Sequence, residues 1–307
     1  MSEGGYQGSR LADTDSAELA RGRTARRQSA ASACVGADSE APPGDLGRFS
    51  AIWEGGMSNS RRLSRIFASD GKSLVLAFDH GAGGANFAGM ADQAKTLRES
   101  VAAGADAVLT TVGVARNHGA VIDRIGLVLS LDRLTGDPEF AVIEAVRLGA
   151  DAGKVICTPW SKENPDSISD TRRLASVCHD WGLPLMVETI PVSFQATDQH
   201  TPEKIGQAAK IGEEIGADVL KIHYTGDLAS FKQAIKPLAL PVVVLGGPSR
   251  PDPRSTLADV VGAMESGAVG VAIGRNIWGY ERPARMVAAL ASIIHGGASA
   301  DQAAREL

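Results

Sequence analysis

The sequence predicts an α/β protein built as one eight-stranded parallel β/α (TIM) barrel, with a disordered N-terminal extension before it. Short apolar runs alternate with amphipathic stretches, and a glycine ends most of those stretches. Near-continuous Val, Ile and Leu runs are typical of strands buried on both faces, as in a parallel sheet. Eight such runs alternating with helices fit a barrel. The structural alternative, an open doubly wound sheet, is less favoured because no G-x-G-x-x-G loop follows the first run.

Residues 1–56 differ in composition from the rest of the chain. They are rich in Ser, Ala, Gly and Arg, poor in Val, Ile and Leu, and show no sustained period. Such a segment buries too little apolar surface to offset the entropy lost on ordering. We therefore expect a disordered extension over 1–56 and a barrel domain over 57–307.

The barrel strands follow in order from the apolar runs. The eight expected strands are 73–79, 107–112, 126–132, 154–158, 183–189, 217–223, 241–245 and 270–273. Two of the connecting helices are clearest, at 90–103 and at 202–215, the second with Thr201 as N-cap and proline at its first position. The expected helix ends carry a glycine just before the next strand, at Gly104, Gly149, Gly182, Gly216 and Gly267.

Charge, apolar run length and the spacing of cysteines and histidines limit the partners and cofactors that the sequence predicts. The formal net charge is −5, with 31 basic and 36 acidic residues, which disfavours nucleic acid or an anionic membrane as the main partner. No apolar run approaches the roughly 18 residues of a membrane span. The cysteines, Cys34, Cys157 and Cys178, and the scattered histidines show no metal-ligand spacing. We expect a cytoplasmic protein without a metal or other cofactor.

Lys221 is the most informative residue, because it interrupts the apolar run 217–223. A lysine between Leu and Ile in a strand must either snorkel to solvent or point into the barrel. In the barrel, desolvation would lower its pKa and make a nucleophilic amine available for Schiff-base chemistry. Period-two alternation puts His223 on the same side, where it could transfer protons or tune the amine. The alternative is a histidine satisfied by backbone carbonyls past the strand.

Two carboxylates and a second lysine also fall on predicted strands. Asp79 ends the first run, where it could move protons or bind substrate hydroxyls, or instead form an Asx-turn or helix cap. Glu188 lies in an apolar run, and burial would raise its pKa as suits a general acid/base. The alternative for Glu188 is a buried ion pair with Lys154. Lys154 opens its predicted strand, so we expect it at the bottom of the barrel in a structural role.

Glycine-bearing segments follow the last two predicted strands. Gly246 and Gly247 come after strand seven, and Gly274 and Arg275 come after strand eight. A barrel's phosphate site is commonly built from these two loops, where glycines expose backbone N–H groups and an arginine adds a bidentate contact. Turns also need glycine, so each loop alone is a weak signal. Trp160, after strand four, is expected to pack, or to border the substrate.

Four segments together carry a resemblance to a known family. They are Phe78-Asp79-His80-Gly81, 221–227 (KIHYTGD), 244–248 (VLGGP) and 274–278 (GRNIW). In this order they resemble the archaeal-type class I aldolases, which include fructose-bisphosphate aldolase, amino-deoxy-heptulosonate synthase and the autoinducer-2 degradation thiolase. The similarity runs from about Ser60 to the C-terminus.

The resemblance implies a barrel enzyme and assigns roles to its residues. It implies that Lys221 forms the Schiff base, that Asp79 assists proton transfer, and that the loops at 246–247 and 274–275 hold a phosphate. It also implies a homo-oligomer, a ring-built decamer. One departure is clear: the family's sugar-phosphate aldolases carry Tyr-Pro-Arg after strand five, whereas this chain has Ile190, which cannot transfer a proton.

Together these residues predict a carbon–carbon lyase acting on a phosphorylated ketose such as fructose 1,6-bisphosphate. Lys221 would attack the ketone, and Asp79, Glu188 or His223 would transfer protons. One alternative is a thiolase-like acyltransferase that uses the same lysine and CoA. The other, from a different functional class, is a barrel that binds a sugar phosphate without catalysis.

Overall fold

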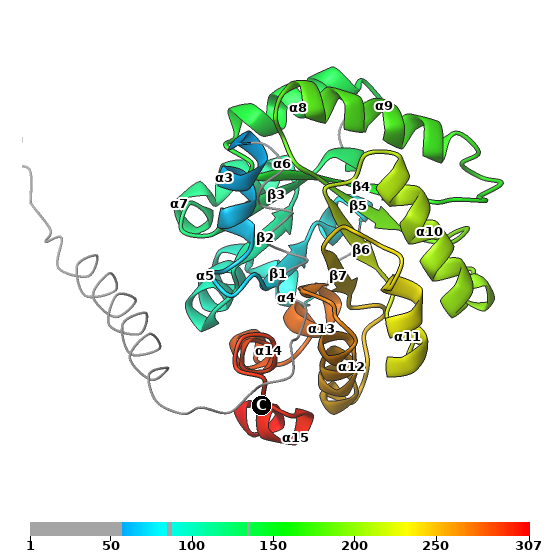
Figure 1. The fold of residues 1–307 in the computed structure, drawn as a ribbon. Coiled ribbons are helices and arrows are strands. Elements are labelled where there is room, and N and C mark those ends of the chain that lie inside the picture. The colour runs from blue at the N-terminus through cyan, green and yellow to red at the C-terminus, as the bar shows by residue number, and fades with distance from the viewer. Residues whose placement is uncertain (1–56, 85–87, 134–135) are drawn as a thin grey trace, which may run out of the picture. The chain divides into compact units, whose positions relative to one another are not determined.

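Eight parallel strands close into a barrel in sequence order, as the sequence predicts (Figure 1). The computed structural model describes residues 57–84, 88–133 and 136–307, so the prediction for residues 1–56 lies outside the described residues. Pairing of β1 with β8 completes the ring. The strands are β1 Ser73–Phe78, β2 Ala107–Thr110, β3 Gly126–Ser130, β4 Ala152–Cys157, β5 Leu185–Thr189, β6 Val219–Ile222, β7 Val242–Leu245 and β8 Gly270–Ile273.

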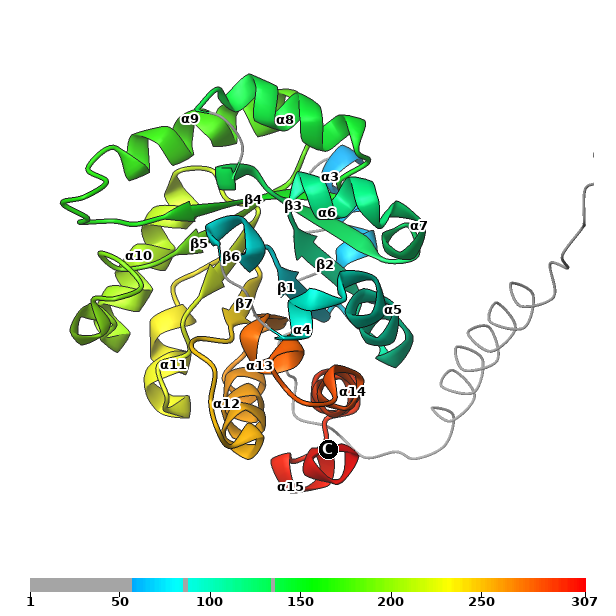
Figure 2. The same cartoon turned by 180° about the vertical axis from the view of Figure 1, so that it is seen from behind.

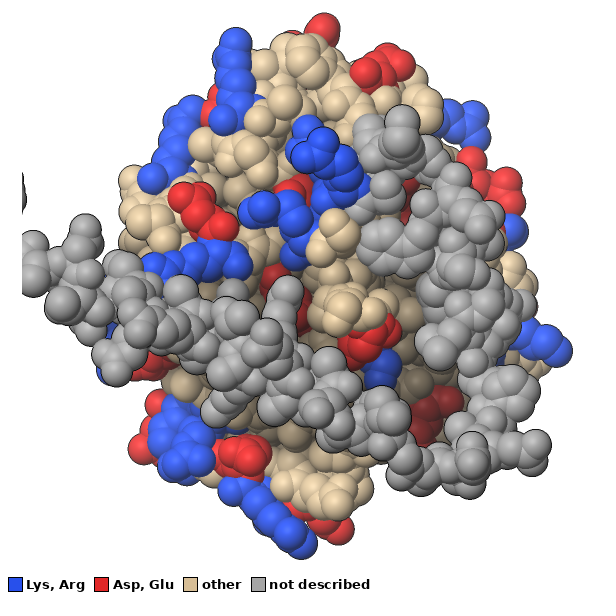
Figure 3. All heavy atoms as spheres, turned by 60° about the vertical axis from the view of Figure 1, so that its left-hand side comes forward, with Lys and Arg blue, Asp and Glu red and all other residues tan. Residues whose placement is uncertain are grey.

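Helices surround the strands, and the views from both sides show them on the outside of the barrel (Figures 1 and 2). They are α3 Met57–Ile66, α4 Ala88–Ala91, α5 Gln93–Ala103, α6 Val112–Asn117, α7 Gly119–Ile122, α8 Pro138–Arg147, α9 Ser167–Asp180, α10 Pro202–Glu214, α11 Leu228–Ile235, α12 Pro253–Glu265, α13 Arg275–Trp278, α14 Pro283–Ile294 and α15 Ala300–Ala303. Among the described residues, no helix is long and apolar enough to cross a membrane. Basic and acidic side chains are interspersed over the coloured part of the face in Figure 3.

Local capping explains where the two best-predicted helices begin. Thr201 accepts a hydrogen bond from the Lys204 N–H (3.3 Å), which confirms the expected N-cap of α10. The single helix expected at 90–103 is instead two helices. Asp92 interrupts it, because its side chain accepts from the Lys95 N–H (2.9 Å) and starts α5 anew.

Side chains on each strand alternate between two separate cores. The barrel interior contains Val75, Leu109 and Val219, while the layer between strands and helices contains Leu220 and Ile222. On β6, Val219 therefore faces inward, whereas Leu220 and Ile222 face outward. Period-two alternation then directs the residues at 221 and 223 toward the barrel axis.

Helix α3 closes the barrel at the amino-terminal ends of the strands. Its Leu63 and Ile66, with the following Phe67, belong to the interior core. The Ser73 hydroxyl at the start of β1 donates to the carbonyl of Ile66 (2.7 Å). Helix α3 thus plugs the lower end of the barrel.

We expect Ile66→Ala to lower the free energy of unfolding by about 2–5 kcal/mol, since it empties a fully buried position in the plug. Urea unfolding measures this. Ser64→Ala, an exposed position on the same helix, is the matched control and should change stability by less than about 0.5 kcal/mol. Equal stability of the two variants would show that α3 does not seal the core.

A histidine bridge ties the last long helix to the lower end of the barrel. After α14, His295 contacts Asp70 through Nδ1 (2.8 Å) and Asp106 through Nε2 (3.0 Å). Burial works to lower the pKa of His295, but the two carboxylates outweigh it and raise the pKa to about 9. The imidazolium form is therefore the one that holds this end of the barrel together near neutral pH.

We expect the stabilisation by His295 to be complete below pH 6.5 and to be lost as the pH rises through about 9, because folding raises its pKa. His295→Gln should lower the free energy of unfolding by about 1–3 kcal/mol at pH 6. Denaturant unfolding between pH 6 and pH 10 measures the difference, which should shrink at the alkaline end. A difference independent of pH would contradict the charged bridge.

Candidate active site

Lys221 lies inside the barrel and pairs with Glu188. The two residues are register partners on β6 and β5, and Lys221 Nζ is 3.0 Å from Glu188 Oε1. Only 4% of Lys221 is exposed, so its side chain does not snorkel into bulk solvent. The inward orientation expected from the sequence is confirmed. A primary amine is thereby held beside a carboxylate in a site screened from water.

Lys154 reaches the same site, and the expectation that it lies at the bottom of the barrel is wrong. Strand β4 begins two residues earlier than expected, at Ala152, so Lys154 is in the strand's inward row. Its backbone is level with Met186, one inward layer below Glu188. The long side chain spans that layer, and Nζ lies 3.2 Å from Glu188 Oε2. The alternative interpretation of Glu188, an ion pair with Lys154, is thus correct.

Asp79 joins the cluster from the end of β1. Its Oδ2 lies 3.3 Å from Lys154 Nζ and 2.9 Å from the Ser130 hydroxyl. Ser130 is also 2.9 Å from Asp132 Oδ1, and Asp132 in turn lies 3.4 Å from Lys154. The side chain of Asp79 makes no helix-capping hydrogen bond, so the capping alternative is not observed. The result is a continuous charged network from Lys221 through Glu188 and Lys154 to two aspartates.

The network keeps its carboxylates ionised, which corrects the expectation for Glu188. Burial works to raise the pKa of Glu188, but the ammonium groups of Lys221 and Lys154 outweigh it, and the pKa is lowered. The pKa of Asp79 is lowered in the same way. Burial works to raise it, but Lys154 and Lys221 outweigh burial, and the pKa falls well below the usual range. The pKa of Lys154 is raised, because Glu188, Asp132 and Asp79 together outweigh its burial. These carboxylates therefore carry charge at neutral pH, which suits them to stabilise a cation.

His223 is on the inward row two residues after Lys221, as predicted. Its ring stacks on His200, with centroids 4.4 Å apart, and meets Phe194 edge-on at 6.4 Å. Its Nε2 is buried and has no hydrogen-bond partner among the described residues, so the alternative of backbone satisfaction is not observed at that atom. Burial, followed by the nearby His200, lowers the pKa of His223 to about 4. The ring is therefore neutral at pH 7.

The glycine loops after β7 and β8 are joined by one side chain. Asn276 donates from Nδ2 to the carbonyls of Gly246 (2.7 Å) and Pro248 (3.2 Å). Gly246 and Gly247 line a cavity of about 100 Å³ together with His223. The predicted phosphate loop and the predicted catalytic histidine thus border one cavity.

Glycine is required at two positions in these loops. A Cβ at Gly274 would lie 2.4 Å from the carbonyl oxygen of Ala77, so the β8 loop can approach β1 only without a side chain. Gly247 has a φ of 64°, in the left-handed region that favours glycine. Both glycines thus allow backbone geometry that other residues would strain.

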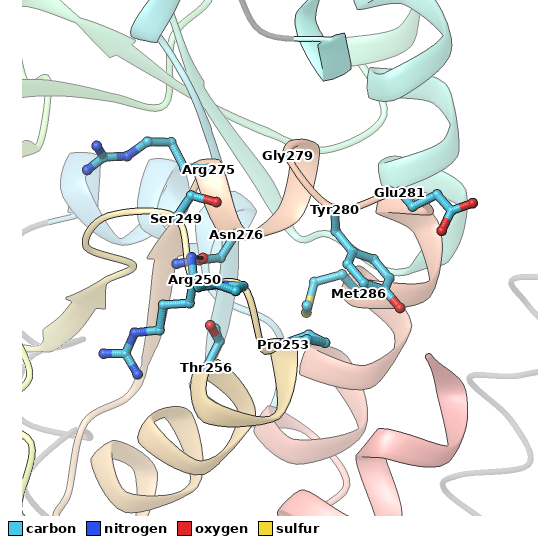
Figure 4. A pocket seen from close by; sticks show the side chains of 11 residues that line it. Ser249, Arg250, Pro253, Thr256, Arg275, Asn276, Gly279, Tyr280, Glu281 and Met286 are labelled. Carbon is cyan, nitrogen blue, oxygen red and sulfur yellow. Dashed lines mark hydrogen bonds between the residues drawn. The ribbon is translucent and has the colours of Figure 1, made fainter.

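A second cavity, of about 350 Å³, lies behind the β7 loop between α12, α13 and α14 (Figure 4). Arg275 and Asn276 border it, and the guanidinium of Arg275 extends away from Tyr280 and Met286. Arg275 Nε is buried and has no partner among the described residues. A guanidinium with an unused donor is therefore available beside the glycine loops.

Residues 73–279 match the family described as DeoC/LacD family aldolase. The chain belongs to this aldolase family. It is 34% identical over 252 residues to the class 1 fructose-bisphosphate aldolase of Thermoproteus tenax, which covers 78% of this chain and 95% of that protein. It is 33% identical over 254 residues to the 2-amino-3,7-dideoxy-D-threo-hept-6-ulosonate synthase of Halobacterium salinarum, covering 79% and 93%.

Solved structures agree with the sequence comparison. An archaeal fructose-1,6-bisphosphate aldolase, solved with its catalytic lysine covalently bound to the carbinolamine intermediate of the substrate, matches with a TM-score of 0.68 at 33% identity. The match covers 78% of this chain and all of that one. This protein is therefore a class I aldolase, a carbon–carbon lyase of the Schiff-base type.

Sequence reasoning missed three groups in the site of this aldolase. Ser130 and Asp132 lie on the inward row at the end of β3, and the same alternation that located Lys221 could have found them. His80, next to Asp79, packs edge-on against Trp278 with centroids 5.3 Å apart, a contact between distant segments that no sequence pattern shows. In the described ranges, no group of three or more His, Cys, Asp or Glu is placed to hold a metal ion.

Proposed function

We propose that Lys221 is the Schiff-base lysine of this aldolase and that the substrate is a phosphorylated ketose. The observation that supports it is the amine of Lys221, buried in the barrel 3.0 Å from Glu188 Oε1. Lys221 passes one ammonium proton to a neighbouring carboxylate and attacks the ketone carbon. The same proton returns to the carbinolamine hydroxyl, which leaves as water and gives a cationic iminium. That cation forms beside an ionised Glu188, which favours it electrostatically.

Bond cleavage then needs one proton to be moved. A base takes the proton from the hydroxyl two carbons from the iminium carbon. The bond between the hydroxyl-bearing carbon and the carbon next to the iminium then breaks, and its electron pair forms an enamine. The aldehyde leaves, the enamine carbon is protonated, and water hydrolyses the iminium. Asp79, held ionised, is suited to take the proton, and neutral His223 is suited to accept or return it.

The phosphate is proposed to bind between the two glycine loops, at Gly246, Gly247, Gly274 and Arg275. Backbone N–H groups and the unused Nε–H of Arg275 provide donors for its oxygens. Holding the phosphate positions the ketone against Lys221, which lowers the entropy cost of the attack.

We expect Arg275→Ala to raise the KM for a phosphorylated ketose by about 10- to 100-fold with a smaller change in kcat, because it removes a charge-assisted contact. Steady-state cleavage assays measure both constants. Arg275→Lys retains a charge without the planar fork and should be intermediate. An unchanged KM in Arg275→Ala would place the phosphate elsewhere.

The substrate proposed first is fructose 1,6-bisphosphate or a related ketose phosphate, in keeping with the Thermoproteus relative. A second candidate is a thiolase-like acyl transfer to CoA through the same lysine. It is favoured by Ile190, which is fully buried at the position where the sugar-phosphate aldolases carry a tyrosine. Assays of a phosphorylated 2,4-diketone with and without CoA separate the two, since only the transferase needs CoA for cleavage.

Borohydride reduction tests the lysine directly. The protein is incubated with dihydroxyacetone phosphate and sodium borohydride, and the modified peptide is located by mass spectrometry. We expect the added mass on Lys221. Label on Lys154, or no label, would refute the assignment.

We also propose that the aldolase forms a homo-oligomer, a decamer. This rests on the resemblance alone. Sedimentation velocity measures it, and a monomer would refute it.

A further inference from the structure

An aromatic wall borders the site next to the reactive lysine. We use this name for Phe194, His200 and His223, because the rings of Phe194 and His200 each contact the ring of His223. Phe194 and His200 come from the loop between β5 and α10, and His223 follows β6 directly. Phe194 is 39% exposed, so one side of the wall is open to an incoming molecule.

The loop that carries the wall is held in a defined position. Val192 has a φ of 64°, and Trp160, in the loop after β4, has a φ of 65°. A left-handed conformation is costly for both residue types, and such strain persists only where surrounding contacts enforce it. The Val192 N–H donates to the carbonyl of Pro159 (2.9 Å), which joins the two loops. His200 Nε2 donates to the Ser193 carbonyl (2.8 Å) and fixes the second ring.

The wall meets the proposed phosphate loops at His223, which borders their cavity, and extends from there past β6 to the β5 loop. The lysine is on β6, the glycine loops follow β7 and β8, and the wall is formed by the β5 loop and the end of β6. A ketose held by its phosphate and bonded at its ketone carbon therefore presents its remaining carbons to the wall. Those carbons become the aldehyde released on cleavage.

The chemistry of the wall does not suit a second phosphate. His223 is neutral at pH 7, because burial and the nearby His200 lower its pKa to about 4. The ammonium of Lys204, at the start of α10, donates a hydrogen bond to the side-chain oxygen of Gln199. An anion against these rings would lose hydration without gaining a charge-assisted partner from them. Aromatic surfaces instead favour apolar or aromatic groups, by area burial and by ring–ring contact.

We propose that the aromatic wall binds the aldehyde half of the substrate, and that this half is unphosphorylated and carries an apolar or aromatic group. The proposal rests on the Schiff-base role of Lys221 proposed above. Of the two substrate types proposed above, it favours the related ketose phosphate, as a monophosphate, over fructose 1,6-bisphosphate.

Condensation with a panel of aldehydes tests the substrate class. The enamine carbon formed from dihydroxyacetone phosphate attacks the aldehyde carbon, the carbonyl oxygen takes a proton, and water then hydrolyses the iminium to release the product. We expect kcat/KM for phenylacetaldehyde to exceed that for D-glyceraldehyde 3-phosphate by at least about tenfold. Equal values, or a preference for the phosphorylated aldehyde, would overturn the proposal.

Variants locate the preference in the wall. Phe194→Ala should reduce the preference for phenylacetaldehyde by about tenfold, while Phe194→Leu should keep most of it. Trp181→Ala is the matched control: Trp181 is also an exposed aromatic residue (44%) but follows the carboxyl end of α9, at the opposite end of the barrel. A loss of preference in Trp181→Ala as large as in Phe194→Ala would refute the wall as its source.

The borohydride experiment separates this proposal from the one on which it rests. Trapping on Lys221 with dihydroxyacetone phosphate does not involve the aldehyde half, so trapping in the parent protein tests the Schiff-base role alone. Failure of trapping in the parent refutes the Schiff-base assignment. Successful trapping without a preference for the apolar aldehyde refutes only the aromatic wall as a binding site.

Discussion

Lys221→Met is expected to reduce kcat/KM for cleavage of a phosphorylated ketose by about 10⁵-fold and to abolish borohydride trapping, because it removes the amine that forms the iminium. Steady-state kinetics and mass spectrometry of the reduced protein measure the two effects. The variant should still fold, since Glu188 keeps its ion pair with Lys154 at 3.2 Å. Methionine fills most of the buried volume without leaving a charge.

Lys232→Met is the matched control, because Lys232 is an exposed lysine on α11, outside the barrel interior. It should retain parental activity and trapping. If Lys221→Met still forms a borohydride-stable adduct, the reactive lysine is a different one, and Lys154 is the first to test.

Lys154→Met is expected to lower the free energy of unfolding by about 3–5 kcal/mol, because it leaves three carboxylates without their shared cation in the barrel interior. The loss should be greater at pH 8 than at pH 5. Without Lys154, Glu188 and Asp79 are held less firmly in the ionised state, so protonation at the lower pH relieves part of their repulsion. Urea unfolding at the two pH values measures the difference.

An exposed lysine shows how much of that loss is due to burial. Lys95 pairs with Glu99 at 3.9 Å on the surface of α5, so Lys95→Met should cost less than about 1 kcal/mol. Similar stabilities for Lys154→Met and Lys95→Met would mean that the charged network does not stabilise the barrel. A low activity of Lys154→Met at full stability would instead assign Lys154 to the chemistry.

The two lysines show which inferences a linear pattern supports. For Lys221, alternation within an apolar run was sufficient, because each neighbour on β6 is apolar and faces outward. Lys154 was instead placed from the expected start of its strand, which is two residues too late, at 154 instead of Ala152. An Ala-Gly start carries little apolar signal, so strand pairing with β3, rather than local composition, decides where β4 begins.

The protonation state of Glu188 also could not be predicted from the sequence. Burial of Glu188 could be predicted from its apolar surroundings, and burial alone raises the pKa of a carboxyl group. The lowered pKa depends on two ammonium groups at about 3 Å, which come from β4 and β6. Such convergence depends on the register of three strands.

By itself, the sequence determined the barrel, its eight strands, the inward position of Lys221 and the glycine loops after β7 and β8, because period, apolar runs and turn residues are local properties of the chain. Only the tertiary structure decided that Lys154, Asp79 and Asp132 share one network and that Phe194, His200 and His223 form one wall. Apart from Phe194 and His200, which share one loop, those groups are far apart in sequence, and ring closure of the barrel brings them within contact distance.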